Sequence, residues 1–297
     1  MNIPLVSVCV QTYQHVNFIK QCLDGILMQQ TNFPFEIILG EDESTDGTRE
    51  ICKKYASKYS DKIKLFLRSR KDVIYINGNA TGRYNLIENL EACKGKYIAL
   101  CEGDDYWIDP LKLQKQVDFL EENSEFSLCF HNSEILNIRG NKDEKIIMHK
   151  NLPKDTFITK DLLCQWFIPT ASIMYRNFDD FVLPPWFKNC GSGDIPLLLL
   201  LSLKGKFKYL DTLMSCYRLH DLGISIKHNG YDKVFSMIYI YQNFNIHSNF
   251  KFEEEINEAM IYEVRKHLPE VRELKKIKKQ LNKNKSSLIK RIIKRIM

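Results

Sequence analysis

The sequence predicts an α/β fold in which a mostly parallel central sheet carries helices on both faces. Over roughly the first 125 of its 297 residues, short apolar runs alternate with segments of helical spacing. Apolar side chains occupy nearly every position of these runs, as is typical of parallel strands buried on both faces. Polar clusters directly follow three of the runs, which fits ligand binding at the carboxyl ends of parallel strands.

The elements of this first half follow in order from local patterns. The strand segments are short and rich in apolar and β-branched residues, and they contain no Pro. The helix segments carry apolar residues at helical spacing, and the last of them has Pro110 in its first turn. The predicted strands are 5–11, 35–40, 63–68 and 96–100, and the predicted helices are 16–29, the segment through Ile51, Tyr55 and Tyr59, 84–93 and 110–123.

The pattern changes after Ser127. Three segments, 127–137, 145–150 and 170–176, predict strands of a mixed-sheet extension, and 206–220 predicts a pair of strands. An apolar helix near Ile195 follows a loop over 183–193, and the chain is expected to be helical from Asp232 onward. The predicted organisation is one domain over 1–230, with halves of about 1–125 and 126–230, and a helical region over 231–297 that ends in a basic amphipathic tail, 271–297.

The net charge of +6 is distributed unevenly. Residues 271–297 hold eleven Lys or Arg against one acid, Glu273, or +10, which leaves −4 on residues 1–270. This mildly acidic body argues against nucleic acid as the partner of the whole protein. Apolar residues between the cations of the tail predict an amphipathic segment on an anionic membrane surface. A helix docked on the domain or in a coiled-coil dimer is the alternative.

Cysteine usage and the N-terminal segment bear on the compartment. The nine cysteines are scattered without a C-x-x-C pair, which argues against a disulfide framework or a zinc site. The N-terminal segment lacks the features of a secretory signal, and no apolar run reaches the roughly 18 residues of a membrane-spanning helix. We therefore expect a cytoplasmic protein, held peripherally at the inner face of the plasma membrane if the tail binds lipid.

The segment "CEGDDYWIDP", residues 101–110, places Glu102, Asp104 and Asp105 directly after a predicted strand. Carboxylates this close repel one another unless a positive group lies between them, so they predict a divalent cation site. A solvated loop in which Asp109 caps the next helix is the alternative. The chain has no G-x-G-x-x-G after its first strand and no G-x-x-x-x-G-K-[ST], which argues against dinucleotide oxidoreductases and P-loop enzymes. Adjacent aspartates also suit a metal better than the separated carboxylates of a glycosidase.

Two segments together resemble the nucleotide-sugar domain of family 2 glycosyltransferases, whose fold is called GT-A. The first runs from "VSVCVQTYQHV" to "EDESTDGT", and the second runs from "GRYNLIENL" to "CEGDDYWIDP". The similarity is dense over 5–123 and continues loosely to near residue 225. It implies a nucleotide-sugar half before about residue 125 and an acceptor half after it. The implied activity is transfer of a sugar from a nucleotide-diphosphate donor to a hydroxyl of a glycan or lipid-linked glycan, with inversion and with Mn²⁺ or Mg²⁺.

The same resemblance implies roles for individual positions. Three positions depart from the usual pattern: Gln14 stands for Asn, Glu41 for Asp, and Glu102-Gly103 for Asp-x. Asp194 in "GSGD" takes the place of the catalytic base, with capping of the following helix as the alternative role. The implied donor-binding residues are Thr12, Tyr13, Glu41, Asp42, Arg83, Asn85, Asp104, Arg218 and His220, and the implied metal ligands are Glu102, Asp104 and Asp105.

Two further alternatives stay open at this point. Trp166, Trp186 and Phe187 either border an acceptor sugar or pack in the protein, and His15 is expected to be structural or exposed. A catalytically silent sugar-nucleotide-binding protein, or a scaffold of a glycan-assembly complex, is the alternative to an enzyme.

Overall fold

The computed structural model describes residues 3–141, 143–163, 165–221, 223, 230–267, 273 and 279. The chain divides into two compact units, Met1–Gly223 and Ile224–Met297. The predicted boundary after residue 230 stays a prediction. The strands of the first unit are β1 (Val6–Thr12), β2 (Phe35–Glu41), β3 (Ile63–Leu67), β4 (Tyr75–Ile76), β5 (Asn79–Ala80), β6 (Tyr97–Glu102), β7 (Tyr106–Trp107), β8 (Phe126–Asn137), β9 (Glu144–Ile147), β10 (Thr156–Phe157), β11 (Met174–Arg176) and β12 (Lys206–Leu219). Its α-helices are α1 (Ile19–Leu27), α2 (Thr48–Lys58), α3 (Arg83–Ala92), α4 (Lys112–Glu122), α5 (Thr159–Leu162) and α6 (Asp194–Ser202).

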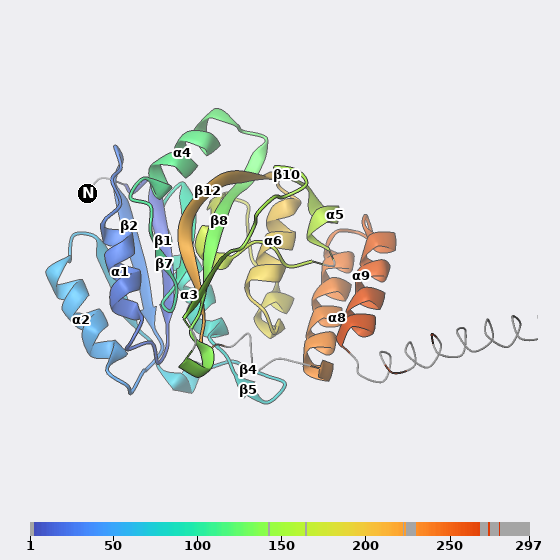
Figure 1. The fold of residues 1–297 in the computed structure, drawn as a ribbon, viewed down its shortest axis with the longest axis horizontal. Helices are drawn as coiled ribbons and strands as arrows, with labels where there is room; N and C mark the ends of the chain where they lie inside the picture. The colour runs from blue at the N-terminus through green and yellow to red at the C-terminus, as the bar shows by residue number, and fades with distance from the viewer. Residues whose placement is uncertain are drawn as a thin grey trace, which may run out of the picture. The chain divides into compact units, whose positions relative to one another are not determined.

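A parallel sheet forms the first half of the unit, as the sequence predicts (Figure 1). Strand β1 pairs in parallel with β2 on one side and with β6 on the other, and β2 pairs in parallel with β3. The full order is β10-β12-β8-β11-β6-β1-β2-β3. The carboxyl ends of β1, β2 and β6 therefore lie next to one another, which brings the polar segments that follow them to one edge.

Helices cover both faces of this sheet. Alternate residues of β1, such as Val8 and Val10, lie in one apolar core with Leu23 of α1 and Leu113 of α4. On the opposite face, a Cβ on Gly40 would meet side chains of α3. The predicted doubly covered sheet is confirmed, and continuous burial explains why its strands are apolar at nearly every position.

The extension of the sheet is mixed. Strand β11 lies between β6 and β8 and is antiparallel to both, whereas β12 runs parallel to β8. The predicted pair of strands over 206–220 is wrong, because β12 is a single strand of 14 residues. Its register against β8 shifts between Leu210 and Leu213 and again before Ser215. These irregularities let the strand continue through the polar residues Asp211 and Thr212 while it stays paired with β8. The segment 170–176 is strand only over Met174–Arg176, after the 3-10 turn η3 (Thr170–Ser172).

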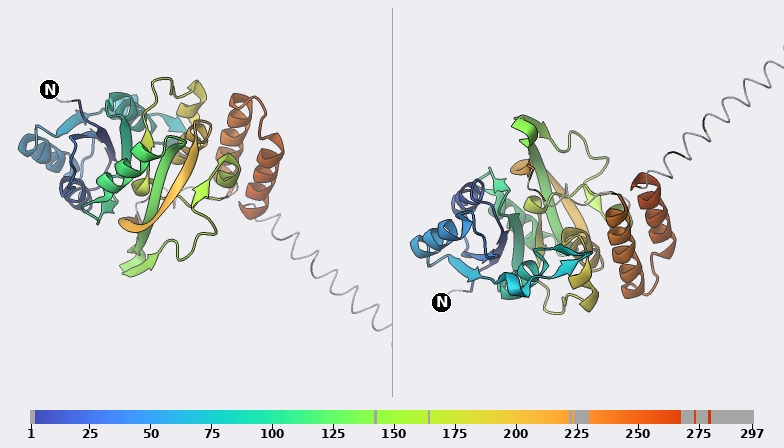
Figure 2. Two further views of the ribbon diagram at one scale, coloured as in Figure 1. Left: turned by 90° about the horizontal axis from the view of Figure 1, so that it is seen from above. Right: turned by 90° about the horizontal axis from the view of Figure 1, so that it is seen from below.

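The second unit contains two helices, α8 (Gly230–His247) and α9 (Glu253–His267). Figure 2 shows them side by side, and the rings of Phe244 and Phe252 lie 6.1 Å apart where the chain passes from one helix to the next. The predicted amphipathic tail, 271–297, lies outside the described residues apart from positions 273 and 279. Within the described part of the chain, no helix is both long and apolar enough to cross a membrane.

The cysteines of the described residues are free thiols inside the protein. Eight of them, Cys9, Cys22, Cys52, Cys93, Cys101, Cys129, Cys190 and Cys216, are buried. The sulfur atoms of Cys22 and Cys101 lie 3.7 Å apart beneath the carboxylate segment. These residues serve as small apolar core residues.

Candidate active site

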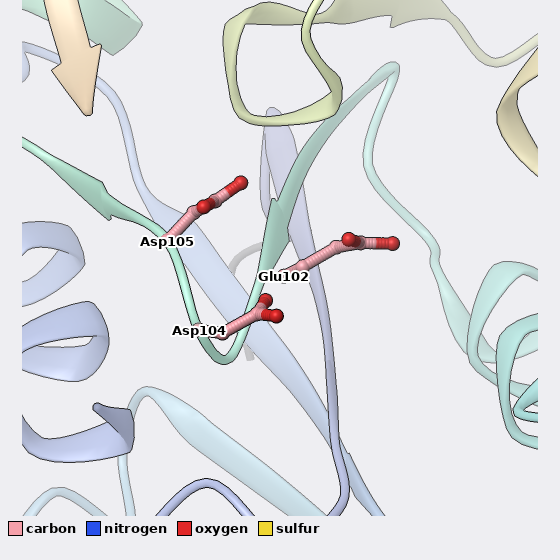
Figure 3. Close-up of side chains that lie close together, drawn as sticks. All are labelled: Glu102, Asp104 and Asp105. Carbon is pink, nitrogen blue, oxygen red and sulfur yellow. The ribbon is translucent and has the colours of Figure 1, made fainter. Parts of the chain in front are cut away.

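Three carboxylates gather at the carboxyl end of β6. Glu102 is the last residue of the strand, Asp104 lies in the turn that follows, and Asp105 directly precedes β7. One oxygen of each lies within 4.8 Å of one oxygen of the others. Figure 3 shows the side chain of Asp104 extending from the turn toward that of Glu102, with Asp105 on the segment that leaves the turn.

Gly103 makes this tight turn possible. A Cβ at this position would lie 2.6 Å from Oγ1 of Thr12 and 2.9 Å from Nδ1 of His15. No side chain fits there, because real Cβ contacts are not this short. The turn after β6 is therefore packed directly against the end of β1 and the residues that follow it. Oγ1 of Thr12 and Nδ1 of His15 are themselves 3.2 Å apart.

The three carboxyl groups have different surroundings. Burial acts to raise the pKa of Asp104, but a hydrogen bond with His220 Nε2 at 3.0 Å and the charges of His15 and His220 lower it. Burial, followed by the charges of Asp104 and Glu102, raises the pKa of Asp105 well above its usual value. Burial, followed by the charges of Asp104 and Asp194, raises the pKa of Glu102 to about 8.

The residues present fit a hard divalent cation. Asp105 Oδ1 accepts a hydrogen bond from the backbone N–H of Arg218 at 2.9 Å, whereas Oδ2 is buried and has no hydrogen-bond partner. A buried carboxylate oxygen without a partner is costly. A cation among the three groups would supply that partner and would relieve the repulsion that, after burial, raises the pKa values of Glu102 and Asp105.

Arg218 connects the end of β12 to the carboxylate turn. Its guanidinium donates to the backbone carbonyl of Asp104 and to the side chain of Gln21. The same guanidinium lies 4.2 Å from the ring centre of Tyr106 and 5.2 Å from that of Phe18. A planar guanidinium suits this place because it stacks and donates hydrogen bonds at once. The structure thus brings Arg218 and His220 to the predicted metal site from more than 110 residues away in the sequence.

The residues predicted to contact the nucleoside lie at the ends of β1 and β2. Tyr13 is 40% exposed, and its ring stacks on the guanidinium of Arg70 at 4.3 Å. Arg70 also donates to Asp42 at 2.6 Å; burial nevertheless raises the pKa of Asp42. Glu41 is fully buried and binds Arg49 and the backbone N–H of Ser44. Glu41 therefore fixes the loop after β2. Asp42 is also buried, and Tyr13 alone of these three is exposed to solvent.

Arg83 and Asn85 belong to α3 and are buried. Arg83 donates to the backbone carbonyl of Cys190 at 2.8 Å, and its guanidinium lies 5.2 Å from the ring centre of Phe187. Asn85 donates to the carbonyl of Gly40 at 2.9 Å. These contacts make Arg83 the support of the loop before α6 and Asn85 a support of β2. Their predicted contact with the donor stays a prediction.

Asp194 is the first residue of α6. Its Oδ1 accepts from the backbone N–H of Ile195 at 2.9 Å and from the hydroxyl of Ser192. Its Oδ2 accepts from Nε1 of Trp166 at 3.0 Å. After burial and the charge of Asp104, the charge of Asp194 also contributes to the raised pKa of Glu102.

Sequence reasoning missed several residues of this site. His15, expected to be structural or exposed, has its Nε2 3.6 Å from Oδ2 of Asp104, and Gln11, to which no role was assigned, donates to Glu102 at 3.0 Å. Arg70 and Gln21 were not singled out either. Gln11 and His15 flank the end of the first predicted strand, so adjacency to that strand end was a usable signal. No sequence pattern indicates that Arg70 or Gln21 would reach the site.

Comparison with known proteins gives a consistent picture. Residues 7–181 match the family described as Glycosyl transferase family 2. An uncharacterized protein of Mycobacterium tuberculosis is 33% identical over 226 residues, which are 74% of this chain and 60% of that protein. The chain thus spans less than two thirds of the length of its mycobacterial relatives. The putative teichuronic acid biosynthesis glycosyltransferase TuaG of Bacillus subtilis is 33% identical over 121 residues, 41% of this chain and 44% of TuaG.

Solved structures show the same fold at low sequence identity. Residues 1–349 of S. aureus TarS in complex with UDP-GlcNAc superpose with a TM-score of 0.61 at 17% identity, covering 88% of this chain and 72% of that one. The mannosyltransferase PcManGT of Pyrobaculum calidifontis, in complex with GDP-Man and Mn²⁺, gives a TM-score of 0.54 at 13% identity, covering 89% and 74%. The predicted GT-A type fold is confirmed by these likenesses, and the family resemblance by the match over more than half of the chain. The chain belongs to glycosyl transferase family 2.

Proposed function

We propose that this protein is a metal-dependent glycosyltransferase. It moves a sugar from a nucleotide-diphosphate donor to a hydroxyl of a glycan or lipid-linked glycan, with inversion, in the assembly of a cell-surface polysaccharide. The observation that carries this proposal is the cluster of Glu102, Asp104 and Asp105 within 4.8 Å at the carboxyl end of β6. The name of TuaG, a putative teichuronic acid biosynthesis glycosyltransferase, supports the class of product. The structure of TarS in complex with UDP-GlcNAc supports the class of donor.

Glu102, Asp104 and Asp105 would hold Mn²⁺ or Mg²⁺, which when bound supplies neutralisation of the negative charge on the donor diphosphate. Arg218 and His220 hold the carboxylate turn in place through Asp104. The partly exposed ring of Tyr13, stacked on Arg70, offers an aromatic face for the nucleoside base. Thr12, Glu41, Arg83 and Asn85 complete the proposed donor site, mainly by fixing the loops that line it.

Asp194 is the proposed base. The oxygen of the acceptor hydroxyl attacks the anomeric carbon, and its proton passes to the carboxylate of Asp194. The bond from the anomeric carbon to the diphosphate oxygen breaks, and its electron pair leaves with the nucleoside diphosphate. Attack on the face opposite to the leaving group inverts the anomeric configuration. Three hydrogen bonds fix the orientation of this carboxylate.

We also propose that the basic segment 271–297 binds the anionic inner face of the plasma membrane. The supporting observation is its charge of +10 with apolar residues interspersed between the cations. A lipid-linked acceptor would then lie near the enzyme.

A donor panel tests the proposed reaction. The full chain is incubated in turn with UDP-, GDP-, ADP-, CDP- and dTDP-sugars, with Mn²⁺ or Mg²⁺ or with EDTA, and release of nucleoside diphosphate is measured. At least one donor should be consumed with metal and none with EDTA. Asp105→Asn should lower the rate by at least about 10²-fold, because a neutral amide is a poor ligand and cannot balance the cation's charge.

A matched control and the competing function decide how the result is interpreted. Asp118→Asn changes an exposed aspartate on α4 and should leave the rate unchanged. Full activity in EDTA, or in Asp105→Asn, would contradict the metal-dependent reaction. A donor that raises the melting temperature but is never consumed would favour the silent sugar-nucleotide-binding protein.

A further inference from the structure

We propose that Trp166 is a positioning residue for Asp194, which determines that Oδ2 of this carboxylate receives the proton of the acceptor hydroxyl. The inference rests on the proposed role of Asp194 as the base. Trp166 precedes Asp194 by 28 residues, and its Nε1 donates to Oδ2 at 3.0 Å. The indole thus comes from a different segment of the chain than the loop and helix that carry Asp194.

The two oxygens of Asp194 differ in how they are held. Oδ1 already has two donors, the backbone N–H of Ile195 and the hydroxyl of Ser192. Oδ2 has the indole N–H of Trp166. A carboxylate oxygen offers about two lone-pair positions. On these contacts Oδ1 is filled, and Oδ2 keeps one position for a substrate hydroxyl. Because the N–H of Trp166 occupies one lone-pair position of Oδ2, the substrate hydroxyl is left with the second position.

Burial does not account for the contact. Trp166 is 42% exposed, whereas Trp107 is 1% exposed. Trp107 must find a partner for its indole N–H inside the protein, and it donates to the carbonyl of Ala171 at 2.9 Å. An exposed indole N–H can bond to water instead. The ring of Trp166 also lies 5.9 Å from that of Tyr217, centre to centre, but burial does not require its N–H to point at a carboxylate. The orientation of a base explains that direction.

The backbone of the Asp194 loop is held by other groups. Arg83 donates to the carbonyl of Cys190 at 2.8 Å, and Gly193 has no space for a side chain because Arg83 and Leu86 lie against it. Loss of the Trp166 N–H should consequently leave the loop in place. It should free only the rotation of the Asp194 carboxylate, so the effect of the indole can be measured separately from folding.

Trp166→Phe is the appropriate variant, because it keeps an aromatic ring and removes the N–H. The first measurement is the indole ¹H–¹⁵N spectrum of the full chain, which has three tryptophans. The signal that disappears in Trp166→Phe is that of Trp166. In Asp194→Asn this signal should move upfield, because the N–H loses a charged acceptor. The signal of Trp107 should stay in place. An unmoved Trp166 signal would overturn the proposal.

The second measurement is donor hydrolysis, with water as acceptor and the donor found active in the panel. Trp166→Phe should lower kcat by about 10-fold with an unchanged KM for the donor, because a misplaced base slows the chemical step alone. Ser192→Ala should lower it less, because Oδ1 keeps the N–H of Ile195. In the Asp194→Asn background, Trp166→Phe should have no further effect.

Two outcomes would contradict the positioning role: the same loss from Trp166→Phe with and without Asp194, or a loss expressed only in KM. Equal melting temperatures of wild type and Trp166→Phe exclude misfolding as the cause. If no donor is consumed by the wild type, the proposed function itself fails. In that case the spectra alone decide whether Trp166 holds Asp194.

Discussion

Asp194 combines a helix position with a candidate chemical role. As the first residue of α6 it binds the N–H of Ile195 through Oδ1, and a negative charge there is favoured by the helix dipole. Its Oδ2 accepts a hydrogen bond from Nε1 of Trp166 and is the proposed acceptor of the substrate proton. Because separate oxygens serve the two roles, a change that removes the charge but keeps the shape can separate them.

Asp194→Asn should lower sugar transfer by roughly 10²-fold or more, because an amide cannot accept the proton. The melting temperature and metal-dependent donor binding should stay near wild type. Release of nucleoside diphosphate and thermal unfolding measure these effects. Asp180→Asn is the control, since Asp180 pairs with Lys204 at 2.7 Å on the surface. A near-normal rate in Asp194→Asn would mean that the base lies elsewhere.

At this scale the sequence predicts part of the site. Glu102, Asp104 and Asp105 are neighbours in the chain, so their proximity follows from local sequence. Adjacency of strand ends also explains why Thr12 and Asp42 lie nearby. The contact between Trp166 and Asp194, and that between Arg218 and Gln21, join segments far apart in the chain. Such contacts depend on the exact packing of the extension, which no local pattern encodes.

Helix α4 supports the strand that follows the carboxylate segment. Lys112, in its first turn, is fully buried with its Nζ 3.9 Å from the ring centre of Trp107 in β7. It donates to Oε1 of Gln116 at 2.7 Å. Burial lowers the pKa of Lys112 to about 7, and the nearby Cys101 and Cys129 oppose this only in part. A buried lysine under an active-site strand makes the stability of this element dependent on pH.

Between pH 7 and about 10, the unfolded chain, with its lysine pKa of about 10.4, binds more protons than the folded one. The free energy of unfolding should therefore rise with pH, at most by about 1.4 kcal/mol per pH unit from this residue. Lys112→Met should stabilise the protein most at pH 7 and below, with a benefit that shrinks toward pH 10. Urea unfolding at several pH values measures this, with the partly exposed Lys115→Met as control. Equal pH slopes for wild type and Lys112→Met would contradict the argument.

The predicted elements differ in how well the sequence defines them. Strands β1, β2, β3 and β6 agree with prediction to within about two residues. In β1, β2 and β6, burial on both faces leaves uninterrupted apolar runs. Strand β12 is one strand where the sequence predicts a pair, and the polar residues Asp211 and Thr212 lie in its middle. Its register shifts against β8 absorb these residues. The antiparallel insertion of β11 between β6 and β8 depends on pairing across the whole domain, so periodicity alone does not show it.

At the scale of the molecule, charge is separated along the chain. Residues 1–270 carry −4 and residues 271–297 carry +10. The acidic body holds the carboxylate site, and the basic segment lies outside the described residues apart from positions 273 and 279. A membrane role for this segment stays a prediction, which follows from its composition alone.

Flotation with lipid vesicles tests whether residues 271–297 bind a membrane. The full chain should float with vesicles that contain phosphatidylglycerol and much less with pure phosphatidylcholine, and added salt should weaken binding. A chain truncated after Pro269 should not float. Changing Lys290, Arg291, Lys294 and Arg295 to Gln should weaken binding by about 4 kcal/mol, at roughly 1 kcal/mol for each cation. Equal flotation of the full and truncated chains would contradict membrane binding by residues 271–297.

The buried thiols have a practical consequence for following motion in this protein. A thiol reagent in solution reaches a core sulfur only when the surrounding segment opens, so the rate of modification at each cysteine reports the free energy of its local opening. Cys101 directly precedes the carboxylate turn, whereas Cys129 lies in the extension, and both are inaccessible in the closed structure. Site-resolved labelling would therefore compare local opening at the carboxyl end of β6 with local opening in the extension of the sheet, using cysteines that the chain already contains.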